Sequence, residues 1–289
     1  MCPLISICLC AWNDAHYLDL LLRSIQETCE FSHEVCIIDN GSEDHINDVL
    51  KKYPQVKSEH LPKNRGSQAV NHAVEMSSGK YIIKASSDMI FVRKAIFNAF
   101  AYHKYLEKKY QTDRISVSST LIEPTGGRNN GLFVKRDFGT DYQSAQYEKI
   151  LSVNDINLKQ REIFEATEPM LMKRTLWDLL SGISDDYPFP GVGNDLDFGL
   201  KLLAHKATSR LCRSAFVYHF VSKTRQNIPE QDHKADEANK VFLDKWGITF
   251  QDYFDMKRDF ERTASYQLEN FILAEQKIQD RFNKIHITT

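Results

Sequence analysis

The sequence predicts an α/β protein with a mostly parallel central sheet that is flanked by helices, and two observations support this prediction. Apolar runs of strand length alternate with helical patterns of about 10 to 15 residues, as in consecutive βαβ units. Polar residues follow the first four of these runs, at Asn13, Asp39, Asn64 and Asp88. Since ligands of such sheets bind beyond the carboxyl ends of the strands, we expect a binding site at this edge.

Each strand is predicted from an apolar run, and each helix from apolar residues at helical spacing. Residues 3–11 form the first strand because the run PLISICLCA is almost continuously apolar, and Asn13 or Asp14 caps the helix that follows. Further strands are expected at 33–39, 56–61, 81–85, 89–92, 115–122 and 169–173, with a strand pair over 209–221. Further helices are expected after a Ser42 cap, between Gly66 and a terminating Gly79, and over 93–110, 174–180, 195–204 and 234–246.

Three segments do not continue this alternation. Residues 123–166 have weak periodicity, which is typical of a long functional loop, and residues 184–194 form a loop rich in proline and glycine. Residues 250–285 contain neither proline nor glycine and carry recurring apolar residues, which predicts helix. We therefore divide the chain into an α/β domain, 1–225, and a C-terminal helical extension, 226–289, through which we expect homo-oligomers to form.

The length and composition are those of a soluble globular protein. The 289 residues permit one large domain or two small ones, and the apolar fraction of 42% is enough for a sizeable core. The formal net charge of -2 gives no electrostatic reason for a nucleic acid or an anionic membrane to be the main partner. We therefore expect no strong general binding of nucleic acids.

The cysteines and the hydropathy bear on the location of the protein. The six cysteines contain no CxxC pair and lie mostly in strand-like runs, so we expect reduced core thiols. No apolar run approaches the roughly 18 residues of a membrane span, and no signal peptide is visible. We expect a cytoplasmic protein, with a peripheral position at a membrane as the alternative.

The stretch from Gly79 to Val92 carries the first chemical motif. A buried strand leads into Ser86-Ser87-Asp88, and a second apolar run follows. A carboxylate at the end of such a strand is placed to hold a metal ion or a polar ligand. The alternative is an ordinary turn, in which serine and aspartate are common.

Six short motifs follow one another along the chain. They are Trp12-Asn13, Asp39-Asn40-Gly41-Ser42, Asn64-Arg65-Gly66 with Asn71, Gly79-Lys80-Tyr81-Ile82 before Ser86-Ser87-Asp88, Asn194-Asp195 and His219. In this order and spacing, the chain resembles the family 2 glycosyltransferases over residues 3 to 222. The resemblance implies the GT-A fold and the transfer of a sugar from a nucleotide-diphosphate sugar.

Two positions depart from the pattern of that family. Ser86 replaces the first aspartate of an Asp-x-Asp motif, so metal ligation would rest on Asp88 and His219. Asn194 replaces the glutamate of a Glu-Asp pair, whereas the aspartate of that pair is present as Asp195. An aspartate with a histidine suits Mn²⁺ or Mg²⁺, because both ions take oxygen ligands and Mn²⁺ also accepts imidazole.

The resemblance also implies a role for each residue of the site. Asp195 would be the general base of an inverting transfer, and Asp39 would contact the nucleobase, commonly uracil, of a UDP- or dTDP-sugar. The donor site would consist of Ala11, Trp12, Asn13, Asp39, Asn64, Arg65, Gly66, Asn71, Ser86 and Ser87. The acceptor site would consist of Trp177, Tyr187, Phe189 and Asn194.

These assignments have structural alternatives. Asp195 and Asp197 would also complement a helix dipole, and we expect Asp197 to point away from Asp195 and to stabilise only the start of the helix. A histidine in an apolar strand, such as His219, is typical of a core. Asp39 is typical of an Asx turn, and the aromatic residues of the 184–194 loop are typical of loop packing.

We therefore predict a metal-dependent enzyme that adds single sugars with inversion. A processive polysaccharide synthase is disfavoured, because the sequence has neither membrane spans nor a Q-x-x-R-W motif. The alternatives are a catalytically weak protein that binds nucleotide sugars, favoured by Ser86, and a nucleotidyltransferase, whose Gly-rich loop after the first strand is missing. The predicted acceptor classes are a glycan, a lipid-linked sugar, a protein and a modified nucleobase.

Overall fold

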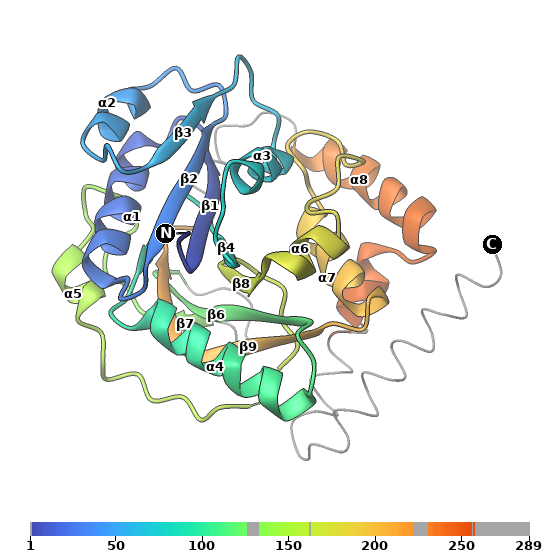
Figure 1. Cartoon of the computed structure of the whole chain (residues 1–289). Helices are drawn as coiled ribbons and strands as arrows, with labels where there is room; N and C mark the ends of the chain where they lie inside the picture. The colour runs from blue at the N-terminus through green and yellow to red at the C-terminus, as the bar shows by residue number, and fades with distance from the viewer. Residues whose placement is uncertain (1, 126–132, 162, 222–230, 256, 258–289) are drawn as a thin grey trace.

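The computed structural model describes residues 2–125, 133–161, 163–221, 231–255 and 257, which form one sheet with helices on both faces (Figure 1). Within these residues the sheet has nine strands in the order β3-β2-β1-β4-β8-β6-β9-β5, with β7 beside β6. The strands are β1 (Ile5–Ala11), β2 (His33–Asp39), β3 (Lys57–His60), β4 (Tyr81–Lys84), β5 (Met89–Phe91), β6 (Ile115–Glu123), β7 (Phe133–Lys135), β8 (Met170–Lys173) and β9 (Thr208–His219).

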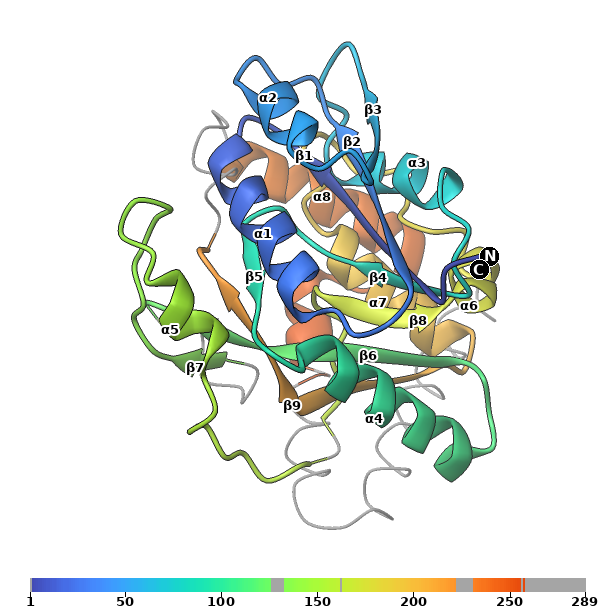
Figure 2. The ribbon, with the colours of Figure 1, turned by 60° about the vertical axis from the view of Figure 1, so that its left-hand side comes forward.

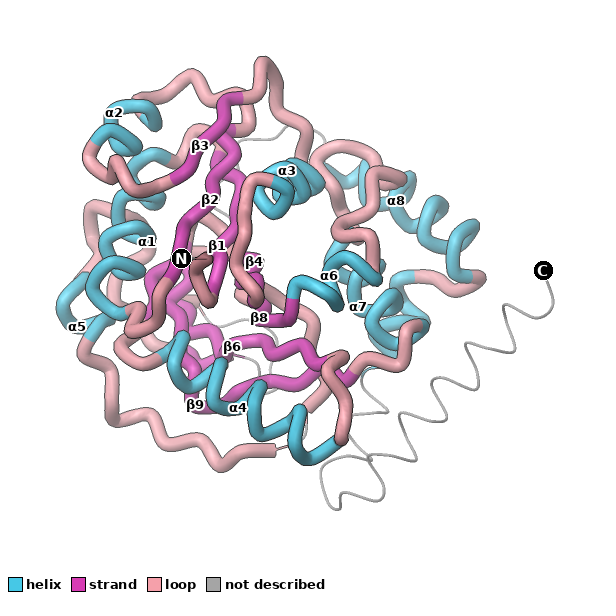
Figure 3. The backbone as a smooth tube through the Cα atoms, viewed as in Figure 1, coloured by secondary structure: helices cyan, strands magenta, loops and turns pink. Residues whose placement is uncertain are grey.

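The helices form two layers, one on each face of the sheet (Figures 2 and 3). They are α1 (Ala15–Thr28), α2 (Ile46–Lys51), the 3₁₀ helix η1 (Ser67–Ala69), α3 (Val70–Glu75), α4 (Ala95–Tyr110), α5 (Tyr147–Leu151), α6 (Arg174–Leu179), α7 (Asn194–Ala204) and α8 (Gln231–Trp246). Successive side chains of a strand point to opposite faces. Ile5, Ile7 and Leu9 of β1 therefore pack with α1, α2 and α4, whereas Cys8 packs with α3, α6 and α7.

The strands β1, β2, β3 and β4 run parallel, so their carboxyl ends lie at one edge of the sheet. In the register, Ala11 of β1 is paired with Asp39 of β2, and Cys8 of β1 is paired with Lys84 of β4. The strands β8 and β5 run antiparallel to their neighbours β4 and β9. This arrangement confirms the predicted fold class and the predicted polar edge.

The strand pair expected over residues 209–221 is instead a single strand. β9 pairs in parallel with β6 from Ile115 to Ile122, and the register shifts between Ser119 and Thr120. A register shift of this kind is a bulge, which bends a strand without ending it. The residues that follow Cys212 therefore bend one strand and do not separate two.

The segment after β2 forms hydrogen bonds with the start of α1. Ser42 does not cap α2, which begins at Ile46; its hydroxyl accepts the N–H of Asn13 at 3.0 Å. Asp44 accepts the N–H of Ala15 at 2.9 Å. The predicted Ser42 cap was wrong because the chain crosses the beginning of α1, where unpaired N–H groups need acceptors.

The six cysteines all lie within the described residues, and each is a free thiol. Cys8, Cys36 and Cys212 are buried as predicted, whereas Cys2 is exposed. Burial raises the pKa of Cys10 to about 11, so this residue is a thiol at neutral pH.

The described part of the C-terminal extension packs on α7. Phe242 of α8 and Tyr253 share a buried cluster with Leu203 of α7. Thr249 and Asp252 form a capping box: the N–H of Thr249 donates to the Asp252 carboxylate at 2.8 Å, and the N–H of Asp252 donates to Thr249 Oγ1 at 3.1 Å. Most of the predicted 250–285 helix, and the oligomer contacts expected from it, lie outside the described residues. Among the described helices, none is both long and apolar enough to cross a membrane.

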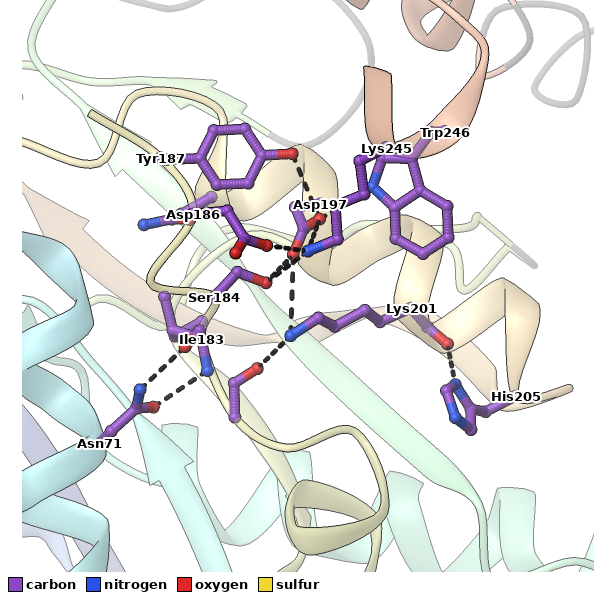
Figure 4. Close-up of polar contacts among 12 residues, drawn as sticks. Asn71, Ile183, Ser184, Asp186, Tyr187, Asp197, Lys201, His205, Lys245 and Trp246 are labelled. Atoms are coloured by element: carbon purple, nitrogen blue, oxygen red, sulfur yellow. Dashed lines mark hydrogen bonds and ion pairs between the residues drawn. The ribbon is translucent and has the colours of Figure 1, made fainter. Parts of the chain in front are cut away.

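Asp197 of α7 lies at the centre of a buried polar cluster that joins α7 to α8 (Figure 4). Its carboxylate accepts hydrogen bonds from Ser184 Oγ at 2.5 Å and Trp246 Nε1 at 2.8 Å, and Lys245 Nζ lies 3.0 Å away. The side chain of Asp197 is 1% exposed. The expectation that Asp197 stabilises only the start of its helix was wrong, because the loop before α7 and the end of α8 both converge on this carboxylate.

Two lysines meet Asp197 in different ways. Burial lowers the pKa of Lys201, and attraction to Asp197, whose carboxylate lies 3.7 Å away, offsets only part of that effect. Burial also acts against the charge of Lys245, but a 2.7 Å bond to Asp186 and the attraction of Asp197 hold its pKa above the usual value. The negative charge of Asp197 therefore stabilises the charged forms of both lysines at the contact between α7 and α8.

A second polar cluster joins the amino-terminal ends of four strands, β1 to β4, around Glu34 of β2. Its carboxylate accepts Ser6 Oγ at 2.6 Å, the N–H of Ser78 at 2.5 Å and the N–H of Gly79 at 3.1 Å, and Lys57 Nζ lies 2.6 Å away. Gly79 was wrongly predicted to end the preceding helix, which ends at residue 75. Glycine is required there instead because a Cβ would lie 2.5 Å from Ser6 Oγ.

We expect Asp197→Asn to destabilise the fold strongly, because the substitution leaves the ammonium groups of Lys201 and Lys245 facing a neutral amide. The free energy of unfolding should fall by about 3 kcal/mol, the usual cost of breaking a buried ion pair from one side. Denaturant unfolding measures this loss. The control Asp185→Asn, exposed in the neighbouring loop, should change stability by less than about 0.5 kcal/mol. Unfolding curves that coincide for Asp197→Asn and the wild type would contradict the role given to this cluster.

We also expect stability to fall with acidification through Glu34. Burial raises the pKa of Glu34, but hydrogen bonds from Lys57, Ser6 and Ser78 outweigh it and lower the pKa to about 2. A carboxyl whose pKa is depressed by folding stabilises the protein above its unfolded pKa, and this contribution is lost as the pH falls from about 5 towards 2.

Denaturant unfolding of Glu34→Gln at pH 7 and pH 3 tests this expectation. The variant should lose on the order of 2 kcal/mol at pH 7, a figure reduced for the exposure of Lys57, and clearly less at pH 3. Glu30→Gln, exposed at the end of α1, serves as the control. A loss for Glu34→Gln that is the same at both pH values would show that the charge of Glu34 does not matter.

Candidate functional site

A cavity of about 320 Å³ lies at the carboxyl edge of β1 and β4. Its wall contains ten of the residues predicted for the site: Ala11, Trp12, Asn64, Gly66, Ser86, Ser87, Asp88, Asn194, Asp195 and His219. These residues come from the ends of β1, β4 and β9, the segment before η1 and the start of α7. The fold therefore gathers residues of the predicted donor, metal and base sites around one cavity.

Asp88 and His219, the predicted metal ligands, lie next to each other in this wall. His219 Nε2 is 3.6 Å from Asp88 Oδ2, and His219 Nδ1 is 2.8 Å from Glu123 Oε1 at the end of β6. Burial lowers the pKa of His219, but the carboxylates of Asp88 and Glu123 raise it by more, so its pKa lies above the usual value. Glu123 thus holds the Nδ1–H side of the ring and leaves Nε2 directed towards Asp88.

A divalent cation fits this pair of side chains. A histidine that ligates a metal normally donates its other ring N–H to a carboxylate or a carbonyl, as His219 does to Glu123. Within the described residues, no group of three or more His, Cys, Asp and Glu side chains could hold a metal ion. Asp88 and His219 would therefore supply two ligands, and Mg²⁺ or Mn²⁺ would take its further ligands from phosphate oxygens and water.

Asp195 reaches the same cavity from the start of α7. Gly193, in the left-handed conformation with a φ of 89°, is the N-cap residue, and α7 begins at Asn194, one residue before the predicted start. Asn194 is buried; its Nδ2 donates to Ser67 Oγ at 2.8 Å, and its Oδ1 has no hydrogen-bond partner among the described residues. The side chain of Asp195 is 59% exposed, so an acceptor can approach its carboxylate.

Two charged residues of the wall, Lys84 and Glu168, were not predicted. Lys84 Nζ forms an ion pair with Glu168 and lies 3.6 Å from Asp195 Oδ1. The other carboxylate oxygen of Glu168 accepts the hydroxyl of Ser86. The family pattern has a carboxylate at position 86, and here Glu168 brings one to that position from the segment before β8.

The segment before η1 is fixed by Asn40 at the end of β2. Its Nδ2 donates to Asn64 Oδ1 at 2.8 Å and to the carbonyl of Gly66 at 3.1 Å, and its Oδ1 accepts the N–H of Arg65 at 2.9 Å. Gly66 has a φ of 75°, and a Cβ there would lie 2.6 Å from the carbonyl oxygen of Pro190. Only glycine therefore lets this segment approach the loop that leads to α7.

Four residues predicted for the donor site do not line the cavity: Asn13, Asp39, Arg65 and Asn71. The carboxylate of Asp39 accepts the N–H of Ser42, three residues on, at 3.0 Å and is 2.7 Å from His60 Nδ1, so both of its oxygens have partners within the protein. The side-chain amide of Asn71 exchanges two hydrogen bonds with the backbone of Ile183, at 2.8 and 2.9 Å. Donor contacts of these residues stay predictions.

Two residues predicted for the acceptor site are part of the core. Trp177 is buried, with its ring centroid 5.6 Å from that of Phe198. Tyr187 is buried and donates its hydroxyl to Asp197 at 3.2 Å. Phe189 is half-buried outside the cavity wall, so Asn194 is the one of the four predicted acceptor residues that lines the cavity.

Half of the chain matches a known family. Residues 6–152 match the model of glycosyl transferase family 2. The hyaluronan synthase of Pasteurella multocida is 25% identical over 307 residues, and the chondroitin synthase of Pasteurella multocida strain Pm70 is 31% identical over 299 residues. These alignments cover 99% and 96% of this chain but 28% of each relative, so the chain spans little more than a quarter of their length.

The fold is also found in a solved structure. The structure of GalNAc-T7 with UDP, GalNAc and Mn²⁺ matches with a TM-score of 0.54 and 12% sequence identity, covering 75% of this chain and 44% of that one. At this identity the similarity establishes the fold alone. Together, the family match and the fold agree with the site described above: the chain belongs to glycosyl transferase family 2 and has the GT-A fold.

Proposed function

We propose that this chain transfers one sugar from a nucleotide-diphosphate sugar, UDP- or dTDP-linked, to an acceptor hydroxyl, with inversion at the anomeric carbon. Asp195 is the general base, and Asp88 with His219 holds Mn²⁺ or Mg²⁺. One observation carries the proposal: the exposed carboxylate of Asp195 and the Asp88–His219 pair lie in the wall of the same cavity.

The chemistry needs these groups in one place. The acceptor oxygen bonds to the anomeric carbon while the bond from that carbon to the diphosphate oxygen breaks. The acceptor proton goes to Asp195, whose exposure leaves room for a hydroxyl at its carboxylate. A bound divalent cation supplies charge stabilisation for the departing diphosphate.

The acceptor is the less defined substrate. Similarity to synthases named for hyaluronan and chondroitin favours a glycan acceptor over a lipid-linked sugar, a protein or a modified nucleobase. The cytoplasm is the location we propose. A second candidate, a nucleotide-sugar-binding protein with weak catalysis, is favoured by Ser86, which replaces a carboxylate that the family pattern has just after β4.

We expect UDP to raise the melting temperature in the presence of Mn²⁺ and to raise it much less in EDTA, because Asp88 and His219 would hold a cation that stabilises the charge of the diphosphate. At UDP concentrations about 100 times the dissociation constant, the stabilisation should correspond to roughly 2.7 kcal/mol. Thermal-shift measurements with UDP, dTDP and GDP, each with and without Mn²⁺, give the change in melting temperature and identify the nucleobase that the chain prefers. Equal stabilisation in EDTA would mean that the metal is dispensable.

We expect Asp195→Asn to keep the fold and the affinity for UDP but to lower transfer by about two to four orders of magnitude, the usual size of a lost general base. The amide has nearly the same volume as the carboxylate and cannot take the proton. Transfer rates and UDP dissociation constants are measured with UDP-sugars and short glycan acceptors.

Asp185→Asn is the matched control for this variant, because Asp185 is exposed in the loop before α7 and does not line the cavity. It should transfer at the wild-type rate. If Asp195→Asn transfers as fast as the control, or loses UDP binding in parallel with activity, Asp195 is not the base.

A further inference from the structure

Lys84 brings a buried ammonium group to the wall of the cavity. It is the last residue of β4, its side chain is 2% exposed, and its strand neighbours include Cys8 on β1 and Met170 on β8. An ammonium in such surroundings is costly unless carboxylates compensate its charge. The identity of its partners therefore indicates what this lysine does.

The two carboxylates near Lys84 come from different elements and differ in their freedom. Glu168, from the segment before β8, is 16% exposed, pairs directly with Lys84 through one oxygen and accepts Ser86 Oγ through the other. Asp195, from α7, is 59% exposed, and its Oδ1 lies 3.6 Å from Lys84 Nζ. Glu168 is thus fixed on both sides, whereas Asp195 faces the ammonium at one oxygen and the cavity with the rest of its carboxylate.

We propose that Lys84, anchored by Glu168, is a positioning residue that orients the carboxylate of Asp195 towards the acceptor hydroxyl. This inference rests on the proposed function, in which Asp195 is the general base. An ammonium 3.6 Å away attracts the ionised carboxylate and limits its rotation. Glu168 is the closer partner and compensates the charge of Lys84 more than Asp195 does.

The step itself is not altered by Lys84. Asp195 takes the proton of the acceptor hydroxyl, the acceptor oxygen bonds to the anomeric carbon, and the bond to the diphosphate breaks with its electron pair. Lys84 takes no part in the proton transfer. Its effect is confined to the orientation of the base, so that a misplaced carboxylate slows transfer while the donor still binds.

A double-mutant cycle tests the proposal. Lys84→Met, Asp195→Asn and the double variant are compared with the wild type for the kcat of sugar transfer and the KM of the donor. We expect Lys84→Met to lower kcat about 10- to 100-fold with the donor KM changed by less than about threefold. In the Asp195→Asn background, Lys84→Met should cost nothing further, because no base remains to be oriented. Losses in kcat that multiply in the double variant would overturn the proposal.

Two further variants separate positioning from folding. Lys84→Met combined with Glu168→Gln removes the buried carboxylate that would be left unpaired, and it should fold, bind UDP with Mn²⁺ and show the same loss in kcat as Lys84→Met. Lys84→Arg keeps the charge and should recover at least part of the rate. Lys80→Met, exposed before β4 and outside the cavity wall, is the control and should transfer normally. A full wild-type rate for the Lys84→Met, Glu168→Gln variant would overturn the proposal.

The experiments distinguish a wrong function from a wrong role for Lys84. If the wild type transfers no sugar from any nucleotide sugar, the proposed function is wrong and the role of Lys84 falls with it. If the wild type and Lys80→Met transfer sugar but the losses at Lys84 and Asp195 multiply, the proposed function stands and the positioning role is wrong.

Discussion

β1 is hydrogen-bonded on both sides by parallel strands, and its register decides which side chains meet at the cavity. Cys8 is paired with Cys36 on β2 and with Lys84 on β4, so these side chains share the face that packs against α3, α6 and α7. If β4 slipped by one residue against β1, all of its side chains would move to the opposite face of the sheet, since the side-chain period of a strand is two. The slip would move Lys84 to the face covered by α1 and α4, away from Asp195. β1 is apolar on both faces but alternates in side-chain size, with the large Ile7 and Leu9 on one face and the small Ser6 and Cys8 on the other, and this alternation opposes that slip.

The ionisable groups of the cavity are held by partners from other elements. Glu123 of β6 holds the ring of His219, and Glu168, before β8, holds Lys84. Both partners belong to the part of the sheet that runs through β8, β6 and β9, whereas the donor motifs belong mostly to β1, β2 and β4. The site is thus assembled between the two halves of the sheet, and its geometry depends on the antiparallel joint between β4 and β8.

The sequence was sufficient to predict the parallel strands and the residues at their carboxyl ends. Ala11, Asp88 and Asn64 follow from local patterns, because a strand, a turn residue and a parallel crossover are all encoded within short stretches. Glu168 could not be found in this way, since it precedes an antiparallel strand whose neighbour is fixed by long-range pairing. Lys84 gave a local signal, a lysine inside the apolar run YIIKA, that was not interpreted.

Asp197 shows the same limit at a helix. Its position two residues after Asp195 predicts a different direction for its side chain, and this was correct. What the side chain meets there depends on Lys245 and Trp246, which arrive from a helix almost fifty residues later in the chain. Helical geometry predicts the direction of a side chain, but the residues that it contacts depend on the tertiary packing of distant segments.

The loop before α7 has consequences for building chimeric enzymes. Three contacts join this loop to the segment around η1. At the start of the loop, the carbonyl of Ile183 accepts the side-chain N–H of Asn71; further along, the carbonyl of Pro190 accepts the N–H of Ser67, and Asn194 Nδ2 donates to Ser67 Oγ. A loop transplanted from another member of the family would therefore lack residues that match the hydrogen-bonding groups of Ser67 and Asn71. The unit that can be exchanged between relatives is the pair of segments 66–71 and 183–194, moved together.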